Sequence, residues 1–349
     1  MENLTLTRTV RVVEPVRDKR LSIVTIIPLY NGARWIERAI NSVLGQTLPP
    51  DEFIVVDDGS TDEGPEIVER LCGQYPITLL RKENGGQSAA RNFGVAHSTG
   101  DLIALLDQDD IWYPTHLEEM IKPFLEDKSG RLGWVYTDFD EVDANGQMVT
   151  KRLIGNLAEH PKRSLLRCLS ENMLITPGAS LIRRTAFEAV EGFDIRLSGY
   201  EDDDLFLRLF RAGYDNIFID TALSQWRIFE GSSGHSNRMY ASAMIYMDKL
   251  MQEFPDDLFR GHYYGRDLIA PRFVQTMMMI YGRSMRNKNA AQCREAVKYL
   301  KRIVPHLRLR HRVPLAMALP FMASPTTGRV FLAGSRTLVR FYRGIVRRR

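Results

Sequence analysis

The sequence predicts an α/β protein with a Rossmann-like, mainly parallel sheet, covered by flanking helices and followed by a C-terminal helical extension. Two observations predict this fold. Short apolar runs alternate with helical patterns from Leu21 to about residue 112, and this alternation is typical of a doubly wound sheet. From about residue 236 to the end the pattern is mostly helical, basic and rich in methionine.

The first elements follow one another closely. Residues 21–31 (LSIVTIIPLYN) have the continuous apolar character of a strand that is buried on both faces. In residues 34–47 the apolar side chains recur at helical spacing. Residues 52–60 (EFIVVDDGS) predict a second buried strand, and residues 64–75 predict a helix with a proline in its first turn.

The alternation then continues and becomes less regular. Residues 77–86 predict a strand and a loop, 87–100 a helix of small residues, and 101–110 a strand that ends in acids. The later elements are a strand and an Asn-Gly hairpin over 134–146, a helical stretch near 161–171, a strand and a helix over 177–194, and a helix and a strand over 200–219.

Polar clusters follow three of the predicted parallel strands. They are Pro28 to Asn31, Asp57 to Ser60, and Asp107 to Asp110. Since ligands of such sheets bind outside the carboxyl ends of the strands, we expect the three loops to meet at one crevice.

The acids of "LLDQDDIW" allow two interpretations. Asp107 and Asp109 are one residue apart on an extended segment, so their side chains point to the same side and suit Mg²⁺ or Mn²⁺. Alternatively, the acids cap the helix that follows, because carboxylates stabilise a helix N-terminus. The motif alone leaves both open.

Charge is divided unevenly along the chain. Residues 1–234 hold 25 Lys and Arg against 37 Asp and Glu, whereas residues 235–349 hold 22 against 6. A basic rear part suits an anionic membrane surface, nucleic acid or an acidic ligand. The longest apolar run, residues 313–323, is too short to span a bilayer. The first twenty residues lack the apolar core of a secretory signal, and three scattered cysteines favour a reducing compartment.

Four segments, in order, resemble the inverting GT-A glycosyltransferases of family 2. The resemblance covers about Leu21 to Ile228. The segments are IIPLYNGARWIERAINSVLGQT, VVDDGSTD, NGGQSAARNFGVAHSTGDLIALLDQDD and GFDIRLSGYEDDDLFLRL.

The resemblance implies a nucleotide-sugar donor, with UDP as the expected nucleotide. Pro28 and Tyr30 match the loop that lies against the base, and Asp58 matches the acid that binds it. Asp107 would contact the ribose or the metal shell. For Arg91 the family suggests contact with the donor phosphates or a structural role within the site.

The resemblance also implies a divalent cofactor, Mn²⁺ or Mg²⁺. Asp107-Gln108-Asp109 matches the DXD element of the family, with Asp109 as the main metal ligand, and Asp110 is then interpreted as the cap of the next helix. Many members carry Arg-x-His near the end of the domain, but here Phe229 stands in place of that histidine. His235 would substitute only if its loop folds back.

"GYEDDDLFLRL" matches the ED motif at the acceptor end of the cleft. The resemblance makes Asp202 the general base and Glu201 the residue that orients the acceptor or the base. Like charges this close also raise at least one carboxylate pKa, which suits a base. We expect Asp203 and Asp204 to include one or two solvated residues of a helix start.

These inferences predict three parts. An N-terminal extension (1–20) precedes a glycosyltransferase domain (21–235), which divides into a nucleotide-sugar half (21–112) and an acceptor half (113–235). A basic, mainly helical region (236–349) follows. The expected reaction transfers a sugar to a hydroxyl of a glycan or lipid-linked glycan, in polysaccharide or cell-surface glycan synthesis. The rival classes are a metal-dependent nucleotidyltransferase and a non-catalytic sugar-nucleotide-binding protein.

The end of the chain predicts contact with a membrane. Residues 336–349 (RTLVRFYRGIVRRR) interleave apolar side chains with arginines, as in cationic helices that lie on anionic membranes. No nucleic-acid-binding motif accompanies them. We therefore expect a cytoplasmic protein, peripheral on the cytoplasmic face of the membrane, and no nucleic-acid partner.

Overall fold

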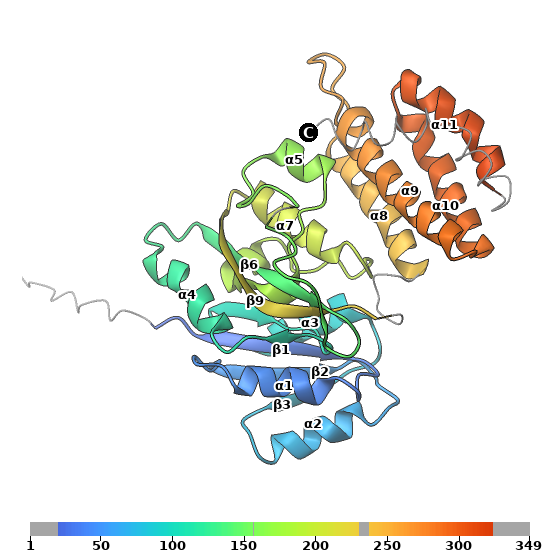
Figure 1. Ribbon diagram of the computed structural model, residues 1–349. Coiled ribbons are helices and arrows are strands. Elements are labelled where there is room, and N and C mark those ends of the chain that lie inside the picture. Colours follow the sequence, from blue (N-terminus) through green and yellow to red (C-terminus); the bar gives the residue numbers. More distant parts are fainter. Residues whose placement is uncertain (1–19, 156, 230–236, 324–349) are drawn as a thin grey trace, which may run out of the picture.

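The computed structural model describes residues 20–155, 157–229 and 237–323, and Figure 1 shows an α/β body that carries a bundle of helices. Within these residues the strands form one nine-stranded sheet in the order β3-β2-β1-β4-β8-β6-β9-β5, with β7 paired to β6. The strands are β1 (Ile23–Leu29), β2 (Glu52–Asp57), β3 (Thr78–Arg81), β4 (Leu102–Leu105), β5 (Ile111–Trp112), β6 (Leu132–Val142), β7 (Met148–Thr150), β8 (Ser180–Arg183) and β9 (Asp215–Arg227).

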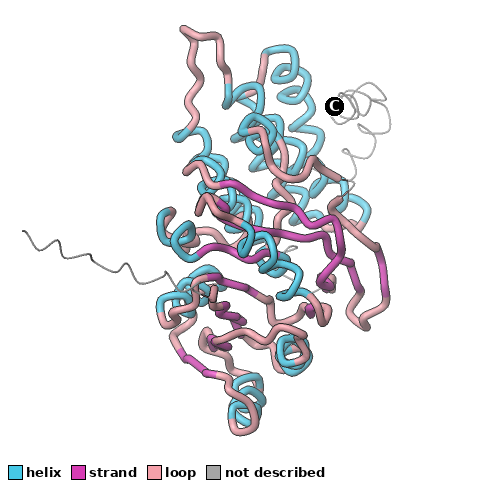
Figure 2. Tube along the Cα trace, turned by 90° about the vertical axis from the view of Figure 1, so that its left-hand side faces the viewer, coloured by secondary structure: helices cyan, strands magenta, loops and turns pink. Residues whose placement is uncertain are grey.

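Helices cover both faces of the sheet, as the alternating pattern predicts (Figure 2). One core cluster joins the sheet to α1, α2 and α4, and a second joins it to α3, α6 and α7. The helices of the α/β body are α1 (Ile36–Leu44), α2 (Gly64–Cys72), α3 (Gln87–Ala96), α4 (His116–Glu126), α5 (Leu165–Ser170), the short η1 (Pro177–Ala179), α6 (Arg184–Ala189) and α7 (Glu201–Arg211).

Close approach of α3 to the sheet depends on a glycine. A Cβ atom on Gly94 would lie 2.6 Å from Cγ2 of Ile26 and 3.1 Å from Cγ2 of Val56. Because glycine has no side chain, α3 packs directly over β1 and β2. This packing brings the polar N-terminal turns of α3 to the edge of the sheet where the parallel strands end.

The first half of the sheet is wholly parallel, whereas the second half combines antiparallel pairs with the parallel pair β6 and β9. β3, β2, β1 and β4 are parallel neighbours, whereas β8 runs antiparallel to both β4 and β6. The antiparallel pair β6 and β7 is a hairpin, and Gly146 in its turn has a φ of 83°, which suits glycine. The whole sheet is therefore mixed, because the second half lacks the regular strand–helix crossovers that keep strands parallel.

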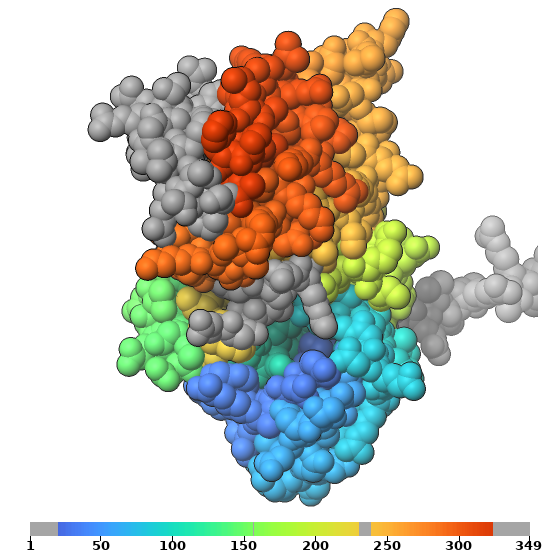
Figure 3. Space-filling model, turned by 90° about the vertical axis from the view of Figure 1, so that its right-hand side faces the viewer, coloured from blue at the N-terminus to red at the C-terminus, as the bar shows by residue number. Residues whose placement is uncertain are grey.

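The C-terminal helices pack on the α/β body as one continuous core. Met244, Met247 and Met277 belong to the same buried cluster as Trp134 of β6, so these methionines fill the core between the helices and the sheet. Figure 3 shows the orange and red bundle stacked on the blue and cyan body. Its elements are α8 (Asn237–Glu253), η3 (Gly265–Ile269), α9 (Ala270–Arg286), α10 (Ala290–Ile303), η4 (Val304–His306) and α11 (Leu309–Met322).

The bundle contains two helices of seventeen residues, α8 and α9. Neither these nor any other helix in the described ranges has the length and apolar character needed to cross a bilayer.

Candidate active site

The three predicted loops meet at the carboxyl ends of β1, β2 and β4, where hydrogen bonds join them. Pro28 is the sixth residue of β1 and is buried, whereas Tyr30 follows the strand and is 45% exposed. Of these two residues, only Tyr30 therefore offers a free side chain at the edge of the sheet. Asp58 follows β2, and Asp107 stands two residues after the end of β4.

Gln108 joins the first and third of these loops. Its Oε1 accepts a hydrogen bond from the backbone N–H of Tyr30 at 2.8 Å, and its Nε2 donates to the carbonyl oxygen of Tyr30 at 3.1 Å. The amide thus fixes the Tyr30 backbone from both sides. Sequence reasoning treated Gln108 only as the spacer between two acids.

Asp58 is buried and holds the glycine-rich loop before α3. Its Oδ1 accepts from the backbone N–H of Gly85 at 3.0 Å, and its Oδ2 accepts from that of Gly86 at 2.7 Å. Lys82 completes the set with an ion pair of 2.6 Å. The carboxylate therefore shapes the Gly85-Gly86 loop before α3, and Lys82 is a functional candidate that sequence reasoning missed.

Arg91 on α3 connects two of the acidic motifs. Its buried guanidinium forms ion pairs with Asp107 and, at 3.2 Å, with Glu201. Burial alone would lower the pKa of Arg91, but these two carboxylates raise it above the ordinary value. Arg91 remains a fixed cation at any physiological pH, and it links the tip of β4 to the start of α7.

Asp109 carries the carboxylate that is best placed for a cation. Burial, together with the nearby charge of Asp107, raises the pKa of Asp109 to about 6. In the described part of the chain, no arginine, lysine or histidine pairs with this carboxylate. Arg227 lies close, but its Nε donates to the main-chain carbonyl oxygen of Asp109 at 3.0 Å.

Asp110 does not cap a helix, so that interpretation is wrong. It is followed by the short strand β5, and α4 begins only at His116. Asp110 is instead buried, and its Oδ1 accepts a hydrogen bond from the backbone N–H of Arg227 at 2.8 Å. Burial and the neighbouring charge of Asp109 hold the pKa of Asp110 well above its usual range.

The four acids at the start of α7 have different partners. Glu201 is buried and accepts hydrogen bonds from Gln87 and Arg91. Asp203 forms an ion pair with Arg272 of α9. Asp204 forms ion pairs with Arg208 at 2.7 Å and with Lys249 of α8 at 2.6 Å.

The expectation that Asp203 or Asp204 is solvated is therefore wrong, since 5% of the surface of Asp203 and 2% of that of Asp204 are exposed. Arg208 lies on α7 itself, four residues after Asp204. Lys249 and Arg272 lie on helices that follow in the sequence, where no local pattern reveals them.

Asp202 is the exception among these acids. Its Oδ1 accepts a hydrogen bond from the backbone N–H of Asp203 at 2.7 Å, and no cation within the described ranges pairs with it. Burial raises the pKa of Asp202 to about 8, and the adjacent charge of Glu201 contributes to this rise. The arrangement leaves a carboxyl group with the basicity needed to accept a proton near neutral pH.

A family model for glycosyl transferase family 2 matches residues 24–191. Chondroitin synthase from Pasteurella multocida (strain Pm70) is 32% identical over 204 residues, which are 57% of this chain and 20% of that protein. An uncharacterized glycosyltransferase of Rickettsia bellii is 31% identical over 234 residues, which are 65% of this chain and 34% of that protein. Residues 24–191 are thus a glycosyl transferase family 2 segment.

The solved structures that resemble this chain show the same fold. S. aureus TarS 1–349 in complex with UDP-GlcNAc has a TM-score of 0.63 at 17% identity, and the match covers 90% of this chain and 92% of that one. The mannosyltransferase PcManGT from Pyrobaculum calidifontis, in complex with GDP-Man and Mn²⁺, has a TM-score of 0.54 at 18% identity, with 89% and 86% covered. The body is thus a GT-A fold with C-terminal helices. The chain spans only 20% to 34% of the length of the two curated relatives named above.

Phe229 stands at the position where the resemblance predicts a histidine, and it makes an apolar contact there. Its ring lies 5.6 Å from the ring of Trp35. The guanidinium of Arg227 covers the same Trp35 ring at 4.8 Å. A histidine ligand is therefore absent from this position, and His235, the predicted substitute, lies outside the described residues.

The set of potential metal ligands is small but compatible with a divalent cation. Among the described residues, no cluster of three or more His, Cys, Asp or Glu side chains has the geometry to hold a metal ion. Asp107 and Asp109 remain as two neighbouring carboxylates, and the raised pKa of Asp109 means that a cation there would relieve their repulsion. Because Mg²⁺ commonly binds through one or two carboxylates, substrate phosphates and water, this pair fits such an ion.

Proposed function

We propose that the chain is an inverting, metal-assisted glycosyltransferase that moves a sugar from a nucleoside diphosphate sugar to a hydroxyl group. One observation carries the proposal. Asp202 is the carboxyl group in the first turn of α7 that no described cation neutralises, and Arg91 links this turn to the Asp107 segment. The buried Arg91 would thus have the proposed base, Asp202, on one side and the proposed diphosphate-binding segment around Asp107 on the other.

The donor is proposed to lie along the strand ends. Tyr30 would lie against the base, and Asp58, which already orders the Gly85-Gly86 loop, would contact the nucleoside. UDP is the proposed nucleotide, supported by the UDP and UDP-GlcNAc named in the TarS complexes. Asp107 and Asp109 would hold the cation, which supplies charge neutralisation for the departing diphosphate.

The acceptor side is proposed to use Asp202 as the general base. The deprotonated carboxylate would take the proton of the acceptor hydroxyl as its oxygen attacks the anomeric carbon, and a single displacement inverts that centre. Glu201 is fixed by Gln87 and Arg91, so it would orient the base or the acceptor. The proposed acceptor is a glycan or a lipid-linked glycan of the cell surface.

A donor panel tests this function. UDP-, GDP- and other nucleotide sugars are incubated with Mn²⁺, Mg²⁺ or EDTA, with and without a lipid extract as acceptor, and release of the nucleoside diphosphate is measured. We expect release from one donor class that EDTA abolishes. Release that is insensitive to EDTA with every donor, or no release under any condition, contradicts the proposal.

The membrane contact remains a proposal from the sequence, because residues 324–349 lie outside the described ones. We propose that the cationic segment 336–349 binds anionic lipid on the cytoplasmic face. Each arginine near an anionic surface contributes about 1 kcal/mol. Changing Arg340, Arg343 and Arg347 to Glu should therefore abolish co-sedimentation with phosphatidylglycerol vesicles.

The control for that measurement is Lys298→Glu on α10, which changes an exposed charge outside the segment. Equal sedimentation of the wild type with neutral phosphatidylcholine vesicles, or no effect of the triple substitution, counts against the proposal.

A further inference from the structure

The first turn of α7 is held by two helices of the C-terminal bundle. Lys249 on α8 lies 2.6 Å from Asp204 and 3.2 Å from Asp194. Arg272 on α9 forms an ion pair with Asp203. Only 16% of the Lys249 side chain and 3% of the Arg272 side chain are exposed, so salt and water screen these pairs weakly.

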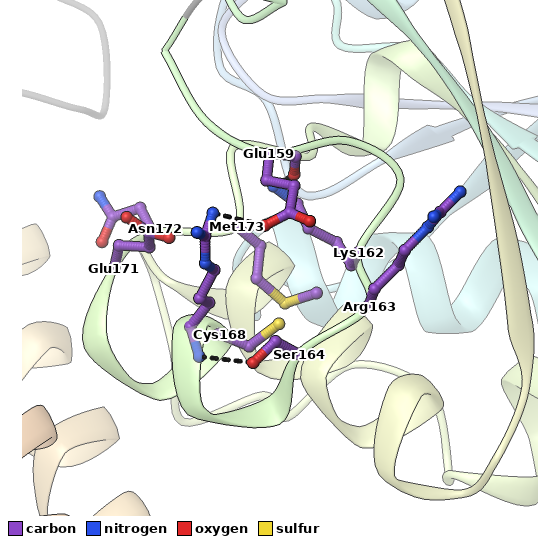
Figure 4. A pocket seen from close by; sticks show the side chains of 9 residues that line it. Glu159, Lys162, Arg163, Ser164, Cys168, Glu171, Asn172 and Met173 are labelled. Carbon is purple, nitrogen blue, oxygen red and sulfur yellow. Dashed lines mark hydrogen bonds and ion pairs between the residues drawn. The ribbon is translucent and has the colours of Figure 1, made fainter. Parts of the chain in front are cut away.

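Arg272 is itself fixed by other partners. Its guanidinium donates to Oδ1 of Asn172 at 3.0 Å and to the carbonyl oxygen of Cys168 at 3.0 Å. Both partners line the pocket beside α5 that Figure 4 shows. Met173, in the same lining, donates its backbone N–H to Oδ1 of Asp203 at 2.7 Å. The carboxylate of Asp203 is therefore held from two directions.

The backbone just before α7 is held by the same two helices. The ring of Tyr200 lies 5.8 Å from that of Tyr246 on α8 and 5.9 Å from that of Phe273 on α9. The backbone N–H of Ser198 donates to Oγ of Ser242 at 2.8 Å. Tyr200 has a φ of 64°, which lies in the left-handed region. This conformation is strained for a tyrosine, so it persists only where surrounding contacts hold it.

We propose that Arg272 and Lys249 are positioning residues for Asp202, so that the C-terminal bundle sets the catalytic competence of the α/β body. This inference rests on the function proposed above. The bundle fixes Tyr200, Asp203 and Asp204 around Asp202, while no described cation pairs with Asp202 itself, which is free to exchange a proton. A small displacement of a reacting group costs a large factor in rate, so the anchors control turnover more than donor binding.

Charge neutralisation is the second effect of these anchors. The titratable groups that face Asp202 are Glu201 and Tyr200 beside it in the chain, Arg91 on α3, Asp107 after β4, Tyr246 on α8 and Arg272 on α9. Without the charge of Arg272, Asp203 becomes an unpaired carboxylate beside Asp202. Its repulsion would raise the pKa of Asp202 further.

The test compares Arg272→Met and Lys249→Met with the control Arg211→Met. Arg211 also joins α7 to α8, through an ion pair with Glu253 at the opposite end of α7. With the donor that is turned over in the panel, we expect at least roughly tenfold lower kcat for the first two variants. The control should keep the wild-type kcat, and all three should keep the wild-type Kd for UDP.

The pH dependence of kcat distinguishes a positioning and charge effect of Arg272 from a merely structural role. In Arg272→Met the acid limb of kcat should move to higher pH, and adding Asp203→Asn should return it towards the wild type. Arg272→Lys should keep the wild-type limb.

The proposal is overturned if the kcat of Lys249→Met and of Arg272→Met matches that of the control at every pH. Should Arg272→Met fail to fold, as judged by circular dichroism, Lys249→Met alone decides in the same way. Wild-type turnover in Asp202→Asn would instead contradict the proposed function itself, so the two failures are distinguishable.

Discussion

At the scale of single residues, neighbouring acids differ in their roles because they differ in their partners. Asp202 and Asp203 are adjacent in sequence, but Asp203 is paired with Arg272, while Asp202 is half-buried and pairs with no cation among the described residues. Asp109 and Asp110 are also adjacent, and only Asp110 accepts a main-chain hydrogen bond from Arg227. Partner and burial, rather than residue type, separate the proposed base and metal ligand from the structural acids.

The pKa of Asp202 predicts the pH dependence of turnover. The base must be deprotonated, and burial places its pKa at about 8, so kcat should rise with pH and level off above about pH 8. Below that value the rate should fall roughly tenfold per pH unit. Initial rates at saturating donor measure this profile, and a constant rate between about pH 6 and pH 8 would rule Asp202 out as the titrating group.

Asp109 and Asp110 predict opposite results for one type of substitution. Asp109→Asn should strongly reduce the activation of the enzyme by Mn²⁺, because it removes one of two proposed carboxylate ligands. Asp110→Asn should leave metal dependence intact, since the amide oxygen still accepts from the backbone N–H of Arg227.

Titrations of activity against Mn²⁺ concentration test this pair. The raised pKa of Asp110 means that folding disfavours its charge, so thermal unfolding of Asp110→Asn should occur at the same or a higher temperature. If Asp110→Asn loses metal activation while Asp109→Asn keeps it, the proposed assignment is reversed.

At the scale of elements, α3 connects the two halves of the site. Gly94 allows α3 to lie close to β1 and β2, and Arg91 on the same helix reaches both Asp107 and Glu201. Asn92 continues this connection by exchanging two hydrogen bonds with the backbone of Phe193, at 2.8 Å and 2.9 Å. Helix α3 therefore fixes the segment before α7 relative to the ends of the strands.

Arg91→Met should destabilise the fold as well as the site. It leaves the buried carboxylate of Glu201 and the partly exposed carboxylate of Asp107 without their shared cation. Breaking a buried pair such as Arg91–Glu201 costs about 3–5 kcal/mol. The matched control is Arg70→Met, which removes an exposed ion pair with Glu37 and should cost less than about 1 kcal/mol. Urea unfolding measures both, and equal losses would show that the Arg91 bridge does not stabilise the fold.

At the scale of the whole molecule, the sequence predicts the parallel half of the sheet well. Each unit from β1 to β4 has a local pattern, an apolar run followed by a helical period, and parallel pairing brings their polar ends together. The antiparallel insertion of β8 between β4 and β6 has no such pattern. Contacts between distant segments decide it.

The same limit applies to the site. Local motifs identified Asp58, Asp109 and Asp202 as candidates, and the structure brings the strand-end and α7 segments together around Arg91. Local motifs did not reveal Lys249 or Arg272, because each lies more than forty residues beyond the acids that it neutralises. The partners that distinguish one acid from the next are thus visible only in the folded chain.

The most direct test of the central claim is the rate of nucleoside diphosphate release by Asp202→Asn at saturating donor and metal. The substitution keeps the shape of the side chain and removes its ability to accept a proton. The account predicts a loss of about 10²-fold or more, with an unchanged Kd for UDP and with full activity in the control Asp248→Asn, whose partner is Arg302 in the bundle. A rate equal to that of the wild type, with UDP still bound, would contradict the account.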